Sequence, residues 1–308
     1  MSTARYFGLS DYFMSKYGHK CIKLSVDGGF SCPNRDGTLS TEGCAFCSER
    51  GSGEFAGVVS DGQKIESNSI AEQIESQKRL LSEKWNAKHF IAYFQNYTNT
   101  YKPKIELEAL YSEALACEGV MGLAIATRPD CIEPEHLALF KKYNVMWVEL
   151  GLQSIHDEKS MWMKRHYSYD HFLKAFELLK EAGIDVVVHL IVGLPGESCD
   201  DFLSSVKHIS ALKPFGVKFH ALNIIKGTSL ASMYLEEPFE LLTESEYIEW
   251  IGKAIQYLDR DIVIHRLTGD GEKASLIAPN WILNKRSVLN GINKSLAKKN
   301  IWQGMKTE

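Results

Sequence analysis

Long apolar runs are absent from this sequence of 308 residues. No stretch approaches the roughly 20 consecutive apolar residues that a transmembrane helix needs. The N-terminal residues also lack the apolar segment of a secretory signal peptide. Both absences favour a soluble, cytoplasmic protein with no membrane partner. Hydrophobic residues still make up 44% of the chain, which is enough for a large core and excludes disorder as a class.

A disulfide framework is also absent, because the seven cysteines are too few and too unevenly placed for one. Three of them, Cys32, Cys44 and Cys47, crowd into one short segment. The other four lie apart: Cys21, Cys117, Cys131 and Cys199. This distribution indicates a reducing compartment and one thiolate metal site, with the scattered cysteines packed as small hydrophobic residues.

Positive charge is in the minority, because the chain has 35 Lys and Arg against 39 Asp and Glu and a formal net charge of −4. It is concentrated at one end, where residues 273–308 hold seven basic side chains and one acid, Glu308. This tail therefore carries +6, and the rest of the chain carries −10. A basic tail on an acidic body suits a polyanionic partner, but the same charges also suit a solvated surface helix. The sequence leaves both interpretations open.

Short apolar runs alternate with amphipathic stretches along the chain. The runs are typical of strands covered on both faces, and we expect strands at residues 21–26, 90–94, 122–127, 146–151, 186–192 and 217–225. Apolar residues at helical spacing predict helices at residues 69–85, 105–117, 134–143, 170–182, 200–212 and 244–258. Gly183 is expected to end its helix in the left-handed conformation.

Six consecutive strand–helix units predict an α/β fold with a parallel sheet and right-handed crossovers. Because six units are too few for a closed eight-unit barrel, a curved, partly open barrel and a doubly wound open sheet both remain. In either fold, functional side chains lie at the C-terminal ends of the strands. We divide the chain into an N-terminal extension at residues 1–19, the α/β unit at 20–259 and a basic C-terminal extension at 260–308.

The loop after the first predicted strand carries the strongest chemical signal, three cysteines in the pattern C-x11-C-x2-C. Its Gly, Pro, Asn and Asp residues let the backbone fold around a metal. A structural zinc site closes with four ligands, and the nearest candidate for a fourth is His19, on the far side of the strand. Three cysteines instead suit an iron–sulfur cluster with one iron left open, and zinc is the alternative.

Polar residues also stand at the ends of later strands. Arg128 follows the third strand in the run TRPD, and Glu149 interrupts the fourth in the run VELGLQS. A buried carboxylate needs partners. Gln153 and Ser154, at the end of the same run, offer further hydrogen-bond donors and acceptors, although Ser154 also suits an ordinary helix N-cap.

Together these strand ends resemble the radical S-adenosylmethionine (SAM) superfamily, in particular the branch that contains the elongator catalytic subunit. The cysteine loop and the runs TRPD and VELGLQS carry the resemblance, together with Arg165 in KRH and Gly193 in HLIVGLPGE. The cysteine spacing departs from the superfamily's commonest pattern, C-x3-C-x2-C, but several branches have a longer first gap. The resemblance covers residues 20–225, most of the chain.

The resemblance implies a partial (βα)6 radical-SAM barrel with a C-terminal extension. It also implies one [4Fe–4S] cluster held by Cys32, Cys44 and Cys47. S-adenosyl-L-methionine would chelate the open iron, and one electron from the cluster would break its sulfur–carbon bond. The 5′-deoxyadenosyl radical formed in this way would abstract a hydrogen atom from the substrate.

The residues expected to bind SAM share a place at the C-terminal ends of the strands: Arg128, Glu149, Gln153, Ser154, Arg165, Gly193 and Leu222. From the resemblance, Arg128 would hold a carboxylate or phosphate through two parallel hydrogen bonds. Glu149 would bind the ribose hydroxyls, and Arg165 would bind the SAM carboxylate. The backbone at Gly193 would approach the adenine or the sulfonium, and backbone groups near Leu222 would read the adenine edge.

The turn-rich C-terminal run at residues 266–281 resembles a bacterial family that is close to the elongator subunit but lacks its acetyltransferase domain. That family implies action on the carbon-5 side chain of the tRNA wobble uridine, with tRNA and an electron donor such as flavodoxin or ferredoxin as partners. The alternatives are the same chemistry on a small molecule or a protein, and a non-catalytic metal-binding protein. A phosphate-bearing substrate is favoured if the tail cations lie on the rim of the barrel mouth.

Overall fold

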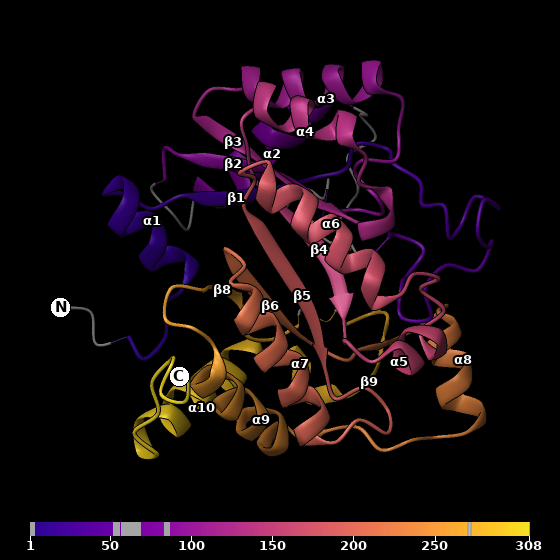
Figure 1. Cartoon of the computed structure of the whole chain (residues 1–308), viewed down its shortest axis with the longest axis vertical. Coiled ribbons are helices and arrows are strands. Elements are labelled where there is room, and N and C mark those ends of the chain that lie inside the picture. Colours follow the sequence, from indigo (N-terminus) through magenta and orange to yellow (C-terminus); the bar gives the residue numbers. More distant parts are fainter. Residues whose placement is uncertain are drawn as a thin grey trace.

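The structure, a computed structural model, describes residues 4–51, 56, 69–82, 87–269, 271 and 273–307. Its centre is a sheet of seven parallel strands in the order β1-β2-β3-β4-β5-β6-β8, curved into half a barrel (Figure 1). The strands are β1 (Ile22–Val26), β2 (Phe90–Phe94), β3 (Val120–Thr127), β4 (Val145–Gln153), β5 (Val186–Val192), β6 (Gly216–Ala221) and β8 (Val263–Arg266). A small antiparallel sheet joins β7 (Ile224–Ile225) to β9 (Leu276–Ala278).

The sequence predicted this sheet well, and the partly open barrel is the correct one of its two arrangements. The first five strands lie within a few residues of their predicted bounds. The sixth, expected over residues 217–225, divides, since β6 ends at Ala221 and β7 begins at Ile224.

The seventh strand, β8, was not predicted and lies in the stretch assigned to the C-terminal extension. It pairs in parallel with β6, where Gly216 faces Val263. Four residues are too few to show a strand period, which explains why the pattern missed it. The boundary predicted at residue 260 therefore falls just before the last strand of the barrel.

The six predicted helices cover the outer face of the sheet (Figure 1): α2 (Ile70–Ser82), α3 (Lys104–Ala116), α4 (Pro134–Lys142), α6 (Tyr169–Glu181), α7 (Cys199–Leu212) and α9 (Glu244–Tyr257). The predicted end of the first, at Trp85, lies outside the described residues. In α6, Phe172, Phe176 and Leu179 are buried at helical spacing. Gly183 follows with a φ of 72°, as predicted for the residue that ends a helix.

Three further helices were not predicted: α1 (Leu9–Tyr17), α5 (Asp157–Trp162) and α8 (Ser229–Glu236). The basic tail, for which a surface helix was one of two interpretations, contains α10 (Lys285–Lys298). Two short 3-10 turns, η1 (Pro129–Cys131) and η2 (Asn280–Leu283), complete the described elements. None of the helices in the described part of the chain is long and apolar enough to cross a membrane.

The inner face of the half-barrel is built in layers, because alternate residues of each strand point inward. The lower layer is apolar, and Phe13 of α1 packs there against Ile91 and Trp147. Two residues further along the same strands, Tyr93 and Glu149 form a polar layer in which the tyrosine hydroxyl donates to the carboxylate at 2.6 Å. The cysteine loop lies beyond this layer, at the C-terminal ends of the strands (Figure 1).

Candidate functional site

The three cysteines lie on the loop that follows β1, as predicted. The loop turns at Cys32, whose carbonyl accepts hydrogen bonds from the N–H groups of Arg35 and Asp36 at 2.8 and 3.1 Å. The guanidinium of Arg35 then donates to the carbonyls of Cys47 and Ser48 at 2.6 and 2.7 Å. Arg35 therefore ties the turn of the first cysteine to the last cysteine and fixes the span of the loop.

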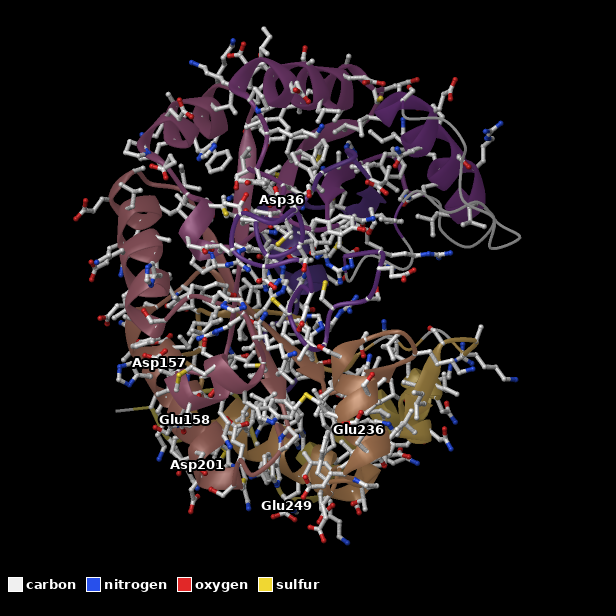
Figure 2. The ribbon with its side chains drawn as sticks, turned by 90° about the vertical axis from the view of Figure 1, so that its right-hand side faces the viewer. Asp36, Asp157, Glu158, Asp201, Glu236 and Glu249 are labelled. Atoms are coloured by element: carbon white, nitrogen blue, oxygen red, sulfur yellow. The ribbon has the colours of Figure 1, made fainter. Side chains whose placement is uncertain are left out.

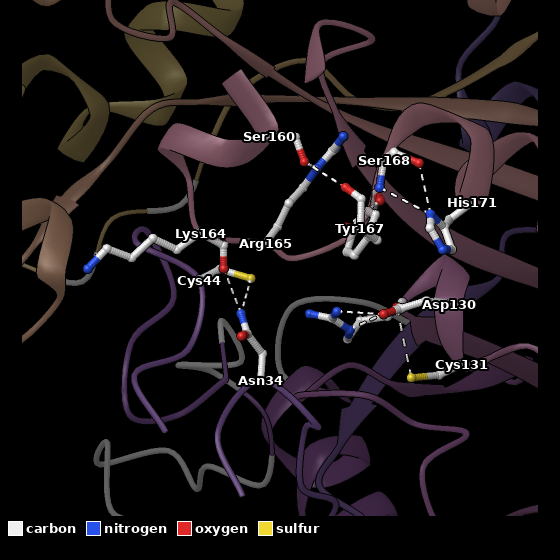
Figure 3. Close-up of polar contacts among 12 residues, drawn as sticks. Asn34, Cys44, Asp130, Cys131, Ser160, Lys164, Arg165, Tyr167, Ser168 and His171 are labelled. Carbon is white, nitrogen blue, oxygen red and sulfur yellow. Dashed lines mark hydrogen bonds and ion pairs between the residues drawn. The ribbon is translucent and has the colours of Figure 1, made fainter. Parts of the chain in front are cut away.

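The second half of the loop is anchored across the barrel mouth. The side-chain amide of Asn34 donates to the carbonyl of Lys164 at 2.8 Å and approaches the sulfur of Cys44 at 3.4 Å (Figure 3). The N–H of Ala45 donates to the carbonyl of Met163 at 2.8 Å. Residues after β1 are thus joined directly to the segment that follows α5, so the loop bridges opposite sides of the barrel mouth.

The cysteine side chains share one electrostatic environment. Burial raises the pKa of the Cys44 thiol to about 12. The neighbouring Cys47 raises this pKa further, whereas the positive charge of Arg128 lowers it. Cys32 also raises the pKa of Cys44, so both other thiols act on Cys44 electrostatically. Among the described residues, no three His, Cys, Asp or Glu side chains converge closely enough to hold a single metal ion. A cubane cluster makes a different demand, because each thiolate binds its own iron, and three thiols on one anchored loop fit it.

A fourth cysteine lies beside this loop. Burial raises the pKa of Cys131, at the end of η1, to about 12, and Asp130 and Cys32 contribute in the same direction. The sequence treated Cys131 as a scattered packing residue. The structure brings it near Cys32, because the end of β3 lies close to the end of β1 in the mouth.

Tyr167 is a central residue of the site that the sequence did not single out. Its ring lies between two guanidinium groups, with the central carbon of Arg128 at 4.8 Å and that of Arg165 at 4.6 Å from its centroid. Its hydroxyl donates to the carbonyl of Gly151 at 2.7 Å. The only local signal was an aromatic residue directly after the run KRH, and this did not reveal that the ring separates two cations.

The bidentate role predicted for Arg128 requires correction. Its guanidinium already grips Asp130 with both arms, with Nε to Oδ1 at 3.0 Å and Nη2 to Oδ2 at 2.7 Å (Figure 3). Only Nη1 is buried without a partner in the described structure. Arg128 can therefore offer a ligand one donor rather than a fork.

Arg165 has the free donors that Arg128 lacks. Its side chain is 0% exposed, and its Nε donates to the hydroxyl of Ser160. That hydroxyl in turn donates to the carbonyl of Tyr167 at 2.6 Å, which holds the guanidinium in place (Figure 3). Both terminal nitrogens, Nη1 and Nη2, are buried without a partner among the described residues. A buried cation with two unused parallel donors fits a carboxylate.

Glu149 lies deeper than predicted, in the polar layer of the barrel, and is fully buried. Its partners are all side chains of the barrel interior: Tyr93, Trp147, His189, Lys218 and Lys23. Burial alone would raise the pKa of Glu149, but Lys218 and Lys23 outweigh it and hold this pKa well below its ordinary value. A ribose contact was expected because the carboxylate lacked partners, and the protein itself supplies them.

Gln153 and Ser154 end β4 and behave differently. Gln153 has a φ of 65°, and its side-chain oxygen is buried with no partner that the structure describes. The hydroxyl of Ser154 donates to Glu197 at 3.1 Å and accepts the N–H of His156 at 3.3 Å, so the protein already satisfies it. Burial raises the pKa of Glu197 to about 7. Gln153 is therefore the better placed of the two to meet a ligand.

Gly193 and Leu222 lie at the ends of β5 and β6. Gly193 has a φ of 82°, and a Cβ there would lie 2.7 Å from the side chain of Leu242, so only glycine fits. The N–H of Leu222 donates to the carbonyl of Val192 at 3.3 Å, and its side chain is buried in an apolar cluster that includes Ala45. The apolar cluster thus packs the cysteine loop against the ends of these two strands.

Several carboxylates lie on the side of the molecule that carries the cysteine loop. Figure 2 views the molecule from this side, with Asp36 of the cysteine loop near the centre and five carboxylates toward the edge: Asp157, Glu158, Asp201, Glu236 and Glu249. Several stand in the first turns of α5 and α7, where a negative charge complements the helix dipole. The basic helix α10 lies beside α9 at the lower left of Figure 1, whereas the loop after β1 lies at the right. The tail therefore gives no support for a phosphate-bearing substrate at the mouth.

Family models match most of the chain: the Radical SAM superfamily over residues 37–209 and the Radical_SAM C-terminal domain over residues 214–298. The "Uncharacterized protein YtqA" of Bacillus subtilis is 36% identical over 303 residues, which is 97% of this chain and 92% of that protein. A "tRNA uridine(34) acetyltransferase" of Methanocaldococcus infernus is 33% identical over 153 residues, 49% of this chain and 29% of that protein.

A solved structure of similar fold is the archaeal Elp3 of Methanocaldococcus infernus with its N-terminus deleted. The TM-score is 0.71 at 19% identity, and the match covers 92% of this chain and 64% of that one. The family models and the relative that matches 97% of this chain show the family, and the solved structure shows the fold. The chain belongs to the radical SAM superfamily, whose enzymes use a [4Fe–4S] cluster and S-adenosylmethionine.

Proposed function

We propose that this radical SAM enzyme modifies the carbon-5 side chain of the wobble uridine in tRNA. The observation that carries the proposal is the similarity over 153 residues to a protein named tRNA uridine(34) acetyltransferase. That similarity covers only 29% of the relative, so it concerns the shared segment and not the whole protein. The same radical chemistry on a small molecule or a protein is the alternative.

The residues at the C-terminal ends of the strands have different roles in this proposal. The thiolates of Cys32, Cys44 and Cys47 hold the cluster on a loop that Arg35 braces. When bound, the cluster and SAM supply the one-electron chemistry, while the protein supplies position and electrostatics. Arg165 orients the carboxylate of SAM with its two unused donors. Arg128, although paired with Asp130, opposes the rise in the pKa of Cys44 and so favours its thiolate.

Arg165→Lys is expected to weaken SAM binding about tenfold to hundredfold while leaving the cluster in place. The lysine keeps the charge but loses the planar fork, and a hydrogen bond to a charged group contributes about 1.5–3 kcal/mol. SAM affinity measured by calorimetry on the reconstituted protein tests this, with iron content as the second readout.

Lys142→Gln is a suitable control, because that lysine is exposed and pairs with Glu108 away from the mouth. Equal SAM affinity in Arg165→Lys and wild type would remove Arg165 from the site. Loss of iron together with affinity would instead assign it to the loop's structure.

The substrate is tested by anaerobic reconstitution, reduction and addition of SAM with and without tRNA from cells that lack this enzyme. We expect 5′-deoxyadenosine in both reactions, more of it with tRNA, and a new mass at the wobble uridine. A flavodoxin or ferredoxin is expected to replace the chemical reductant. SAM cleavage that tRNA does not change, with no modified nucleoside, would redirect the search to small molecules and proteins.

A further inference from the structure

The inner face of the half-barrel is open to solvent between the polar layer and the C-terminal ends of the strands. On the neighbouring strands β3 to β6 (Figure 1), four inward-facing residues are only partly buried, and we call them the inner patch: Ala126, Gly151, His189 and His220. The outward-facing residues beside them, Leu150, Leu190 and Phe219, are 0% exposed. Small residues on β3 and β4 therefore leave room on the inner face, and β5 and β6 present two histidines to it.

The inner patch adjoins the residues assigned to SAM. The carbonyl of Gly151 accepts a hydrogen bond from the hydroxyl of Tyr167 at 2.7 Å. The ring of Tyr167 in turn lies against the guanidinium of Arg165, at 4.6 Å from its centroid. A radical formed from SAM can react only with a substrate that is held beside it. The inner patch is therefore well placed to bind the substrate.

Glu149 fixes the proton of His189. The Nε2 atom of His189 lies 2.8 Å from Oε2 of Glu149, a carboxylate whose pKa is well below its ordinary value and which therefore only accepts hydrogen bonds. Burial, followed by the charge of Lys218, lowers the pKa of His189 to about 4, so the ring is neutral at neutral pH and carries one proton. That proton lies on Nε2, facing the carboxylate, and Nδ1 is left as a hydrogen-bond acceptor.

His220 is neutral as well, and its proton is not fixed. Its ring lies beside that of His189, with the two centroids 5.1 Å apart. Burial, followed by the charge of Arg266, lowers the pKa of His220 well below its ordinary value. Its Nε2 is buried with no partner among the described residues, so no bond decides which nitrogen carries the proton. In both rings, Nδ1 has no bond to a residue that the structure describes and is not among the buried polar atoms, so it is accessible.

One fixed acceptor beside one adjustable nitrogen suits a neutral group that has an N–H next to a carbonyl. A phosphate or carboxylate does not suit it, because neither ion has a proton to give to Nδ1 of His189. We propose that His189 and His220 bind the imide edge of the uracil base, with Nδ1 of His189 accepting the base N–H and Nδ1 of His220 donating to a base carbonyl. This inference rests on the proposed function and names the residues that read the base, whose pairing edge is the part that an enzyme acting on a base recognises.

His189→Phe and His220→Leu are each expected to lower modification of limiting tRNA about tenfold in the reconstituted enzyme, because each removes one hydrogen bond to the base. SAM affinity, iron content and SAM cleavage without tRNA stay unchanged. Since Nε2 of His220 has no described partner, His220→Leu leaves the melting temperature unchanged or raises it, which separates base binding from folding. His208→Leu is the matched control, because that histidine is exposed on α7.

The contact itself is tested with a carbodiimide reagent that modifies N3 of uridine. In tRNA from cells that lack this enzyme, the wobble uridine is expected to be protected when the tRNA is bound to the wild-type protein with SAM. Binding to His189→Phe is expected to leave it reactive. A wobble N3 that stays reactive in the wild-type complex overturns the imide contact.

Failure of this inference differs from failure of the proposed function. If the wild type modifies tRNA and both histidine variants do so equally well, the histidines do not bind the base and the proposed function stands. If tRNA neither stimulates the wild type nor is modified by it, the proposed function falls and the uracil contact falls with it.

Discussion

Cys44→Ala is expected to leave the purified, reconstituted protein without its iron–sulfur cluster and without SAM cleavage. Iron should fall from about four atoms per chain to background, because only three thiolates of the loop hold the cluster and one has been removed. The surrounding loop keeps its other anchors, since Arg35 and Asn34 bond to backbone carbonyls. Iron and sulfide content, the visible absorption band and the yield of 5′-deoxyadenosine measure the effect.

Two other cysteines provide the comparison for this result. Cys117→Ala is a neutral control, because that thiol follows α3 and contacts the carbonyl of Glu113 at 3.5 Å. Cys131→Ala is the sharper test, since Cys131 lies near Cys32. We expect it to keep both cluster and cleavage activity. A full cluster in Cys44→Ala, or its loss in Cys131→Ala, would replace the ligand set proposed here.

Glu149→Ala is expected to lower the free energy of unfolding by about 3–5 kcal/mol. The substitution removes one carboxylate but leaves Lys218 fully inside the barrel, where its charge has lost its ion-pair partner. Because the pKa of Glu149 is well below 4.5 in the folded state, the stabilisation is present above that pH and is lost as the pH falls. Urea unfolding of wild type and variant at neutral pH measures the difference.

Two variants make this prediction specific. Glu108→Ala breaks a surface pair with Lys142 and should cost no more than about 1 kcal/mol. Glu149→Leu combined with Lys218→Met should recover part of the loss, because apolar residues of similar size can replace a buried ion pair. A stable Glu149→Ala protein with weakened SAM binding would contradict the structural role and restore the ribose contact first expected from the sequence.

Most of the barrel was predictable because its strands and helices carry local periodic signals. Phe172, Phe176 and Leu179 repeat at helical spacing, and the turn at Gly183 follows from a single residue. The short strand β8 has no such period, and its pairing with β6 depends on contacts far along the chain. Local pattern therefore predicted six strands of seven.

At the site, too, some properties could be predicted from local sequence and others depend on the tertiary structure. Arg165 could be named from its run, but the two unused donors that make it a carboxylate site depend on Ser160 and on burial. Arg128 was expected to hold a ligand through two hydrogen bonds, but its Nε and Nη2 already donate to Asp130. Tyr167 escaped notice because its position between two arginines arises only when the ends of β3 and β4 meet in the mouth.

By itself, the sequence indicated the class of the protein, because the cysteine loop and the runs at the strand ends together resemble the radical SAM superfamily. It also predicted the order of six strands of the main sheet and of the six helices that cover it, since their periods are local. Only the tertiary structure decided which charged side chains lie close enough to interact. Glu149 finds its partners on β1, β2, β5 and β6, and the basic helix α10 lies beside α9 instead of at the mouth. Electrostatic partners are set by distance in space, and distance in sequence does not reveal it.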